Sequence, residues 1–374
     1  MSDNPSFVLK AVEDVVYEQR PIPEISGNQV LIKIKKTGIC GSDVHFYAHG
    51  RIAHLVAKNM VLGHESAGIV HAVGPDVKHL KVGDRVAVEP GITCGTCDTC
   101  RLGRYNLCAD IAFAATPPTD GTLARFYRVP AHLAYPLPDG LSLEDGAMME
   151  PLAVAVHAVS SLGSFRNNQT IAIFGCGPVG LLCMAVARAF GASRIIAVDI
   201  VQSRLDFAKE YTGADTYLPI PFKEGESKVE YSQRSASAMQ QQLGIEDRGP
   251  KAVDLVIDAS GAEVSIQTAF YIAKTGGTFV QVGIGAFDVT VNFGMLLIKE
   301  LTCKGAFRYG PGDYPHAIAL VAQGKIDLRP LVTHRFPFDQ ALTAFNATRD
   351  GKSKDGKGVL KAIISGPDVP IDED

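Results

Sequence analysis

The sequence predicts an α/β protein in which a doubly wound parallel sheet accompanies a second, β-rich domain. The chain has 374 residues, which is enough for about two domains. Short alternating segments separated by Gly and Pro fill its first part. From Thr170 onward, apolar strand-like segments alternate with helical ones. Such alternation requires crossover connections and therefore a parallel sheet covered on both faces.

Composition and charge exclude several classes of function. Apolar residues make up 46% of the chain and the formal net charge is −4. Without a basic excess or a long basic run, neither nucleic acid nor an anionic membrane is indicated as a partner. The opening "MSDNPSFVLK" lacks the pattern of a signal peptide, and no apolar run is long enough to span a bilayer. We therefore expect a soluble, non-secreted, cytoplasmic protein.

The first domain begins with an alternating segment, "QVLIKIKKTG" at residues 29–38. Further β-rich segments follow in "GIVHAVG" and "GDRVAVEP". Alternation of apolar and polar residues is typical of half-buried strands, and the intervening Gly and Pro residues indicate turns. A loop-rich domain of short strands is expected here.

Four cysteines lie close together in the segment "EPGITCGTCDTCRLGRYNLC" at residues 89–108. In a reducing cytosol, closely spaced thiols indicate metal binding rather than disulfides. Four thiolates complete a tetrahedron around zinc and leave no position for a substrate, so such a site is structural. A disulfide-bonded loop is the alternative interpretation. The proposed ligands are Cys94, Cys97, Cys100 and Cys108.

The second domain begins near Thr170. The segments "TIAIFG", "RIIAVD", "VDLVIDAS" and "GTFVQVG" are strand-like. "PVGLLCMAVARAFG", "IVQSRLDFAKEYTG" and "AEVSIQTAFYIAKTG" are helical. The polar residues 221–249 are interpreted as a surface helix or loop. After residue 310 come helical "HAIALVAQG" and "FDQALTAFNATRDG", and a final strand "GVLKAIIS".

A dinucleotide-binding motif follows the first of these strands. "TIAIFGCGPVGLL" has the G-x-G-x-x-G spacing at Gly175, Gly177 and Gly180. These glycines allow a tight turn, close approach to a pyrophosphate and close helix packing, and the helix N-terminus attracts the phosphates. Asp199 ends the next strand, nineteen residues later, where it can accept hydrogen bonds from the adenosine ribose. A carboxylate there repels a ribose phosphate, which favours NAD over NADP.

An ordinary glycine-rich turn is the alternative to this motif. Arg204 either pairs with Asp199 and lines the adenosine site, or binds a phosphate if Asp199 turns away. The cofactor-binding residues expected from this part of the chain are Gly175, Gly177, Pro178, Val179, Gly180, Asp199 and Arg204.

A second candidate metal site has fewer ligands. Cys40 lies in "TGICGSDVH", His64 and Glu65 in "VLGHESAG", and Glu150 in "MMEPLAVAVHA". A catalytic zinc has about three protein ligands and one position for water or substrate. Each residue alone also has a structural explanation: a buried thiol, a hydrogen-bonded core histidine, or a solvated carboxylate. Their spacing by itself does not establish that they converge.

The order of these motifs is similar to that of a known family. "TGICGSDVH", "VLGHESAG", the four-cysteine loop, "FGCGPVG" and "GAFRYG" resemble the zinc-containing medium-chain dehydrogenases, over nearly the whole chain. Within that family they resemble the polyol branch of sorbitol, xylitol and L-arabinitol dehydrogenases. "FAATPPTDGTLARFY" and "LLCMAVARAFGAS" most resemble the fungal xylitol dehydrogenases, or D-xylulose reductases.

The resemblance implies a domain organisation. A GroES-like catalytic domain is expected from residues 1–155 and 297–374, and an NAD-binding Rossmann domain at 156–296 is inserted in it. Relatives are commonly tetramers, so a homotetramer is expected.

The resemblance also implies a catalytic zinc in addition to the structural one. Its ligands are Cys40, His64 and a carboxylate, either Glu65 or Glu150, with the other carboxylate acting through water. Asp43 is expected to orient His64. Ser42 with His45 matches the proton relay of the alcohol dehydrogenases, and Glu150 is an equal candidate for that role.

Substrate and nicotinamide contacts are likewise carried over by resemblance. The polyol contacts are Phe46, Glu150, Arg308 and Tyr309, with Phe46 in the place of a tyrosine found in sorbitol dehydrogenases. A domain-interface salt bridge is the alternative for Arg308. The nicotinamide contacts are Val282, Gly283, Ile284, Ala306, Phe307 and Arg308. Leu55 stands where relatives often have phenylalanine or methionine.

The implied activity is NAD-dependent oxidation of a polyol secondary hydroxyl to a ketose, with xylitol to D-xylulose first. Sorbitol and L-arabinitol are close alternatives, because one carbon or one inverted hydroxyl is a small energetic distinction. A zinc- and NAD-binding regulatory protein without turnover is the alternative of a different class. The complete set Cys40, His64, Glu65 and Glu150 favours the enzyme.

Overall fold

The computed structural model describes residues 3–373, which form two compact units. One contains residues up to Glu150 together with those from Gly310 onward, and the other is Pro151–Tyr309. The second unit therefore ends at Tyr309, later in the chain than the expected domain boundary between residues 296 and 297. The reason is that strand β18 (Thr302–Gly305) pairs with β17 (Ala273–Gln281) and so completes the sheet of the second unit. The second unit begins at Pro151, within helix α3 (Leu143–Val156). The expected boundary between residues 155 and 156 lies in the same helix.

The first unit is built around a seven-stranded mixed sheet. Its strands follow the order β12–β8–β7–β3–β20–β19, and β11 also pairs with β3. Val30, Ile32 and Ile34 of β3 are buried in one apolar cluster of this unit, as the alternation in the sequence predicts. The strand bounds are β3 (Gln29–Gly38), β7 (Glu65–Val73), β8 (Arg85–Val88), β11 (Phe126–Pro130), β12 (Ala134–Pro136), β19 (Val332–Phe336) and β20 (Lys361–Ser365).

Smaller elements complete this unit. A three-stranded sheet has the order β2–β1–β6, and two two-stranded ribbons pair β4 with β5 and β9 with β10. Their bounds are β1 (Pro5–Ala11), β2 (Asp14–Gln19), β4 (Arg51–Ile52), β5 (Leu55–Val56), β6 (Met60–Val61), β9 (Gly91–Ile92) and β10 (Ala112–Phe113). The other helices of four or more residues are α1 (Gly41–His49), α2 (Asp98–Arg101), α9 (Asp313–Ala322) and α10 (Ala341–Asp350).

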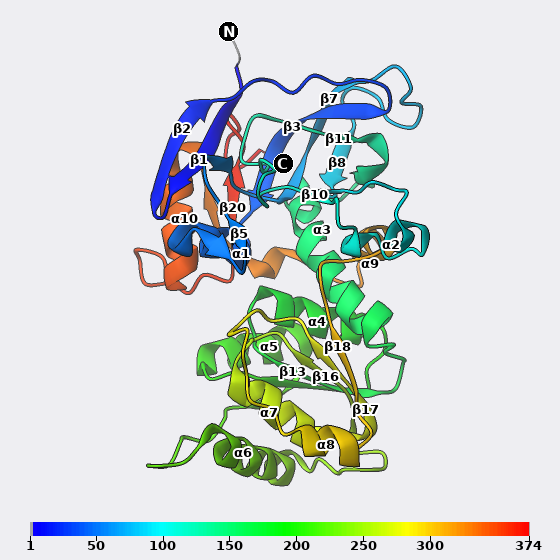
Figure 1. The fold of residues 1–374 in the computed structure, drawn as a ribbon, viewed down its shortest axis with the longest axis vertical. Coiled ribbons are helices and arrows are strands. Elements are labelled where there is room, and N and C mark those ends of the chain that lie inside the picture. The colour runs from blue at the N-terminus through cyan, green and yellow to red at the C-terminus, as the bar shows by residue number, and fades with distance from the viewer. Residues whose placement is uncertain (1–2, 374) are drawn as a thin grey trace. The chain divides into compact units, whose positions relative to one another are not determined.

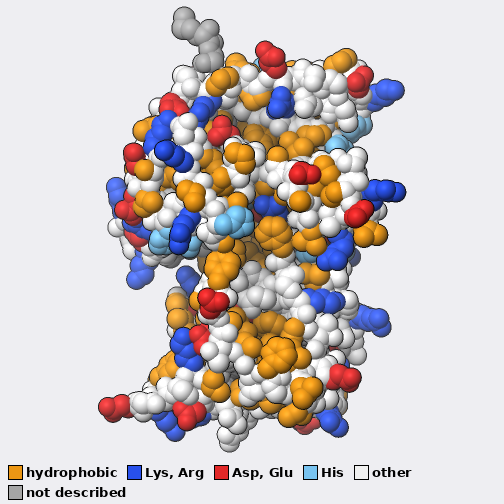
Figure 2. Space-filling view, in the orientation of Figure 1, with side chains coloured by type: hydrophobic (Ala, Val, Ile, Leu, Met, Phe, Trp, Pro, Cys, Tyr) orange, Lys and Arg blue, Asp and Glu red, His pale blue; other side chains and the backbone are white. Residues whose placement is uncertain are grey.

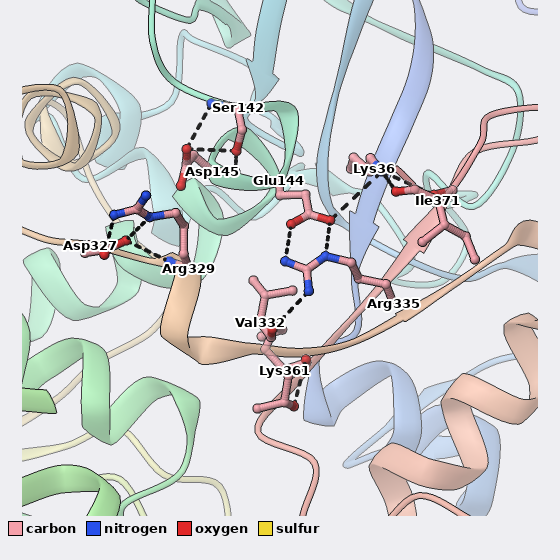
Figure 3. A network of polar contacts seen from close by, with 12 residues as sticks. Lys36, Ser142, Glu144, Asp145, Asp327, Arg329, Val332, Arg335, Lys361 and Ile371 are labelled. Carbon is pink, nitrogen blue, oxygen red and sulfur yellow. Dashed lines mark hydrogen bonds and ion pairs between the residues drawn. The ribbon is translucent and has the colours of Figure 1, made fainter. Parts of the chain in front are cut away.

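Polar contacts join the two chain segments of the first unit (Figure 3). The guanidinium of Arg335 donates two hydrogen bonds of 2.7 Å to the carboxylate of Glu144. The ammonium of Lys36, which is 1% exposed, donates to the carbonyl of Ile371 at 2.7 Å and lies 4.0 Å from Glu144. The bidentate contact of Arg335 with Glu144 and the buried contact of Lys36 with Ile371 hold together residues from the two ends of the sequence.

The second unit contains a six-stranded sheet in the order β15–β14–β13–β16–β17–β18, in which every pair is parallel. Helices α4 and α5 lie on one face, and α6, α7 and α8 on the other (Figure 1). This confirms the doubly wound Rossmann fold. Its remaining bounds are β13 (Thr170–Phe174), α4 (Pro178–Ala189), β14 (Arg194–Val198), α5 (Gln202–Thr212), β15 (Asp215–Tyr217), α6 (Lys228–Leu243), β16 (Val253–Asp258), α7 (Glu263–Ile272) and α8 (Phe293–Ile298).

The polar segment 221–249 contains a surface helix, α6, with a loop on either side of it. Helix α6 begins after Ser227, whose hydroxyl accepts from the backbone of Glu230 while the Glu230 carboxylate accepts from the backbone of Ser227. Tyr231 and Met239 lie on its buried face, which packs against α7.

Among the helices of residues 3–373, none combines the length and the apolar character needed to cross a membrane.

The strand order places a topological switch point between β13 and β16. The chain leaves β13 toward one edge of the sheet and later returns to β16 on its other side. Crevices at such points, outside the carboxyl ends of the strands, are where ligands bind in doubly wound sheets. The glycine motif follows β13 directly and therefore lies at this point.

Candidate functional site

The four cysteines of residues 94–108 converge in the first unit. The sulfurs of Cys94, Cys97, Cys100 and Cys108 all lie within 4.8 Å of one another. The backbone N–H of Cys97 donates to the sulfur of Cys94 at 3.3 Å. Hydrogen bonds from the backbone of Thr96 and of Cys97 lower the pKa of Cys94 to about 6. All eight cysteines are free thiols, so this set has the donors and the spacing of a closed zinc site.

A buried carboxylate ties this loop to the sheet. The hydroxyl of Tyr105, within the loop, donates to Glu89 at 2.6 Å, and that of Tyr135 on β12 donates to the other oxygen at 2.8 Å. Glu89 is 0% exposed, and burial raises its pKa despite the two donors. No role was predicted for Glu89 from the sequence. Its position directly after the strand β8, whose last three residues are apolar, was the one feature that could have indicated a buried carboxylate.

A second cluster joins Cys40, His64 and Glu65, whose ligand atoms also lie within 4.8 Å of one another. The sheet brings them together. In the pairing of β3 with β7, Gly38 lies opposite Glu65, so Cys40, two residues past Gly38, comes close to His64 and Glu65. One thiol, one imidazole and one carboxylate are three ligands of the kind found in catalytic zinc sites, which leave a fourth position open.

Asp43 orients His64. Nδ1 of His64 lies 3.2 Å from Oδ2 of Asp43, and Oδ1 of Asp43 accepts from the backbone N–H of Gly63 at 3.0 Å. Burial lowers the pKa of His64, but the negative charges of Asp43 and Cys40 outweigh it and raise that pKa well above its usual value. The cluster therefore attracts positive charge, as a cation site requires. A side-chain hydrogen bond also joins His64 to Cys40, its neighbour in this candidate metal site.

Lys361 contacts Glu65 of this cluster, and no sequence motif indicated it. Its ammonium donates to the two carboxylate oxygens of Glu65 at 2.8 and 2.7 Å and to the carbonyl of Ile39 at 3.1 Å. Lys361 is 3% exposed. Burial lowers its pKa, but the charge of Glu65, followed by those of Cys40 and Glu150, raises it overall. A lone lysine in the apolar strand "GVLKAIIS" was the signal that could have revealed it.

Glu150 lies near this cluster without being one of its three members. It is 5% exposed on α3, and its charge acts on Lys361 and on Tyr314.

Helix α1 carries the expected relay and one expected substrate contact. His45 is exposed, and burial, followed by the charge of His49, lowers its pKa. Ser42 is half-buried. Phe46, expected to meet the substrate, is 3% exposed and belongs to the apolar cluster that also contains Phe7 and Phe345.

The glycine motif of the second unit has the geometry that a dinucleotide requires. Gly175 has φ +95°, which a side chain rarely adopts, and a Cβ on Gly180 would lie 1.8 Å from the carbonyl oxygen of Gly175. At Gly177 a Cβ would meet no atom within 4 Å, so its backbone faces open space at the start of α4. These are the roles of the tight turn, the close helix packing and the pyrophosphate approach.

Asp199 is held by two backbone N–H groups. Cys176 donates to one of its oxygens at 2.8 Å and Val201 to the other at 2.9 Å. The residue is 8% exposed, and each oxygen keeps a lone pair for a further donor. Arg204 is half-buried on α5.

The remaining expected cofactor residues lie in the loops after β17 and β18. Ile284 is 71% and Phe307 52% exposed, and the guanidinium of Arg308 lies 4.6 Å from the centre of the Phe307 ring. Arg308 has φ +60°, a strained conformation for a residue with a side chain. Tyr309 is 2% exposed.

Comparisons with known proteins agree with this architecture. Residues 26–139 match the alcohol dehydrogenase GroES-like domain, and residues 178–323 match the zinc-binding dehydrogenase domain. A probable D-xylulose reductase A of Aspergillus clavatus is 50% identical over 97% of this chain and 97% of its own. D-xylulose reductase A of Aspergillus niger is 46% identical over 98% of both chains. The crystal structure of 2R,3R-butanediol dehydrogenase from Bacillus subtilis is 29% identical, with a TM-score of 0.83 over 97% of this chain and 99% of that one.

Proposed function

Since the chain belongs to the zinc-containing medium-chain dehydrogenases, we propose that it oxidises xylitol to D-xylulose with NAD as hydride acceptor. The observation that carries the proposal is the cluster of the half-buried Cys40 with the buried His64 and Glu65, in a chain that also has a dinucleotide motif. Relatives named D-xylulose reductase at 46–50% identity over nearly the whole chain support xylitol as substrate.

The activity is tested by mixing the zinc-loaded protein with NAD and xylitol, sorbitol or L-arabinitol and following NADH absorbance. We expect kcat/KM to be highest for xylitol. A higher value for sorbitol or L-arabinitol would reassign the substrate. No NADH formation with any polyol at full zinc content would support the non-catalytic regulatory protein instead.

In the proposed reaction, Cys40, His64 and Glu65 hold the catalytic metal. Zinc at such a site supplies a Lewis acid that favours deprotonation of a hydroxyl near neutral pH. Asp43 holds the ring of His64 in one orientation, and Lys361 holds the carboxylate of Glu65. We assign Glu150 a role through water, because it is not among the three residues whose ligand atoms converge.

The proton released from the substrate needs an acceptor. His45 is exposed and its lowered pKa keeps the imidazole neutral at pH 7, so it can take up a proton and pass it to solvent. Ser42, on the same helix, completes the proposed relay, and Glu150 is the other candidate acceptor. Arg308 and Tyr309 are proposed to contact the polyol hydroxyls, and Phe46 is proposed as a further substrate contact.

Asp199 is proposed to select NAD. Replacing Asp199 with Ala should weaken NADH binding about ten- to a hundredfold, because hydrogen bonds from the ribose hydroxyls to a carboxylate are lost. NADPH binding should change much less. Both dissociation constants are measured by fluorescence titration of the zinc-loaded protein.

Asp199→Asn serves as the control for this change. It keeps an acceptor for one of the two backbone N–H groups that Asp199 holds, so it separates ribose recognition from loop disruption. An equal loss of NADH and NADPH in both variants would show that Asp199 does not discriminate the coenzymes.

The four-cysteine site is proposed to be structural. Cys100→Ser should lower the zinc content from two ions to one per chain and the unfolding free energy by roughly 2 kcal/mol or more. In the protein that remains folded, the ratio of kcat/KM values among the polyols should be unchanged. The exposed Cys303→Ser is the matched control for loss of a thiol. Native stability together with abolished turnover would reverse the assignment.

The protein is further proposed to be a cytoplasmic homotetramer. Strand β18 is an edge of its sheet, and α8 has no buried residue. Several large apolar side chains of the second unit are at least half exposed, and Figure 2 shows apolar side chains gathered on one face of that unit. They include Phe287, Phe293, Leu297 and Ile298. Grouped exposed apolar side chains of this kind are typical of an interface. Sedimentation equilibrium should give four times the chain mass; a monomer would exclude the assembly.

A further inference from the structure

Asp258 lies at the switch point of the second sheet and is not accounted for by the roles described above. It ends β16, with Phe174 of β13 opposite it on one side and Gln281 of β17 on the other. The residue is 0% exposed. A fully buried carboxylate is costly unless donors surround it, so its hydrogen bonds indicate what it holds in place.

The carboxylate of Asp258 binds both neighbouring loops. From the loop that follows it, the Ser260 hydroxyl donates at 2.6 Å and the Gly261 N–H at 2.8 Å. From the end of β17, Nε2 of Gln281 donates at 2.6 Å and also donates to the carbonyl of Gly283 at 2.8 Å.

The backbone of Asp258 adds to this link. Its carbonyl accepts from the N–H groups of Val282 and Gly283, both at 2.8 Å. The side chain and the main chain of one residue therefore fix the positions of residues 260–261 and 281–283.

These two loops meet backbone to backbone. A Cβ on Gly283 would lie 2.4 Å from the backbone nitrogen of Gly261, and one on Gly285 would lie 1.9 Å from its oxygen. A Cβ on Gly175 would lie 3.0 Å from the nitrogen of Ser260. With so little side-chain volume between the loops, side-chain packing contributes little to their spacing, and the polar contacts of Asp258 take that role.

We propose that Asp258 is a positioning residue that joins the loop at Ser260–Gly261 to the loop at Val282–Gly283, and that it sets the affinity for the nicotinamide half of NAD. This inference rests on the proposed function, in which Val282, Gly283 and Ile284 line the nicotinamide. Asp199 serves the adenosine half from the end of a different strand, β14, so the two carboxylates act on different halves of the cofactor.

The test compares two ligands on the zinc-loaded, full-length protein: NADH, and ADP-ribose, which lacks the nicotinamide. In Asp258→Asn, an amide donor replaces one acceptor oxygen opposite N–H donors. The dissociation constant of NADH should rise about ten- to a hundredfold, while that of ADP-ribose should stay within about threefold of wild type. Asp215→Asn, an exposed carboxylate on the edge strand β15, is the matched control and should change neither.

A second variant covers the case in which Asp258→Asn does not fold. Gln281→Met removes the donor that joins Asp258 to Gly283 and leaves the carboxylate its other partners. NADH binding should weaken about three- to tenfold with ADP-ribose unchanged. Equal weakening of both ligands, or wild-type NADH binding in a folded variant, would overturn the inference. If the wild-type protein binds NADH and oxidises xylitol while both variants bind like wild type, this inference alone fails; if the wild-type protein does neither, the proposed function fails.

Discussion

Replacing Cys40 with alanine is expected to reduce kcat/KM for xylitol by about a thousandfold or more, because the loss of one ligand removes a Lewis acid that contributes several kcal/mol. The zinc content should fall from two ions to one per chain, since the four-cysteine site is untouched. NADH binding should be unchanged, because the glycine motif and Asp199 belong to the other compact unit. The measurements are NADH absorbance, atomic absorption and fluorescence titration.

Cys303→Ala is the control for this experiment, because Cys303 is an exposed thiol outside both cysteine clusters. It should retain two zinc ions and full turnover. The assignment of the catalytic site is wrong if Cys40→Ala also keeps two zinc ions and turns over xylitol at the wild-type rate.

Replacing Lys361 with methionine is expected to destabilise the protein by about 3–5 kcal/mol, because it leaves the buried carboxylate of Glu65 without the ammonium group that pairs with both of its oxygens. Glu65 and Lys361 are 1% and 3% exposed, so water cannot take the place of the lost partner. A loss of this size lowers the melting temperature of a unit of this length by on the order of 10 °C. Calorimetry of the wild type and the variant measures it.

A double-mutant cycle distinguishes the ion pair from general disruption of the core. Glu65→Gln alone leaves the ammonium of Lys361 unpaired, whereas Glu65→Gln with Lys361→Met leaves no buried charge in this pair. The double variant should therefore be more stable than the sum of the two single changes predicts. Simple additivity would mean that the two residues do not stabilise each other, and Lys361→Arg should retain most of the stability because it keeps the charge.

The dinucleotide motif and the four-cysteine loop could be predicted because both are local. Gly175, Gly177 and Gly180 lie within six residues, and the structure has them in a tight turn between β13 and α4. The cysteines lie within fifteen residues, a distance that one loop closes by itself. In both cases the residue types and their spacing already limit the conformations that the segment can adopt.

For the second metal cluster, the candidate ligands could be named from the sequence, but their convergence could not be predicted from it. Cys40 and His64 are 24 residues apart, and the sequence does not say whether two strands pair at the register that brings them together. The expectation that Cys40 and His64 bind one metal came from the family resemblance and not from their spacing. The substrate contact expected of Phe46 likewise comes from the resemblance; its ring is 3% exposed and belongs to an apolar cluster of the first unit.

Periodicity and short spacing are enough to predict the fold class, the dinucleotide motif and the four-cysteine loop, because they act within single segments. The partners of the buried carboxylates follow instead from contacts between segments that are distant in the sequence. Lys361 reaches Glu65 from 296 positions away through the pairing of β20 with β3, and Asp258 reaches Gln281 from the neighbouring strand. Sheet register sets such contacts, and register depends on the packing of the whole unit rather than on any one stretch of residues.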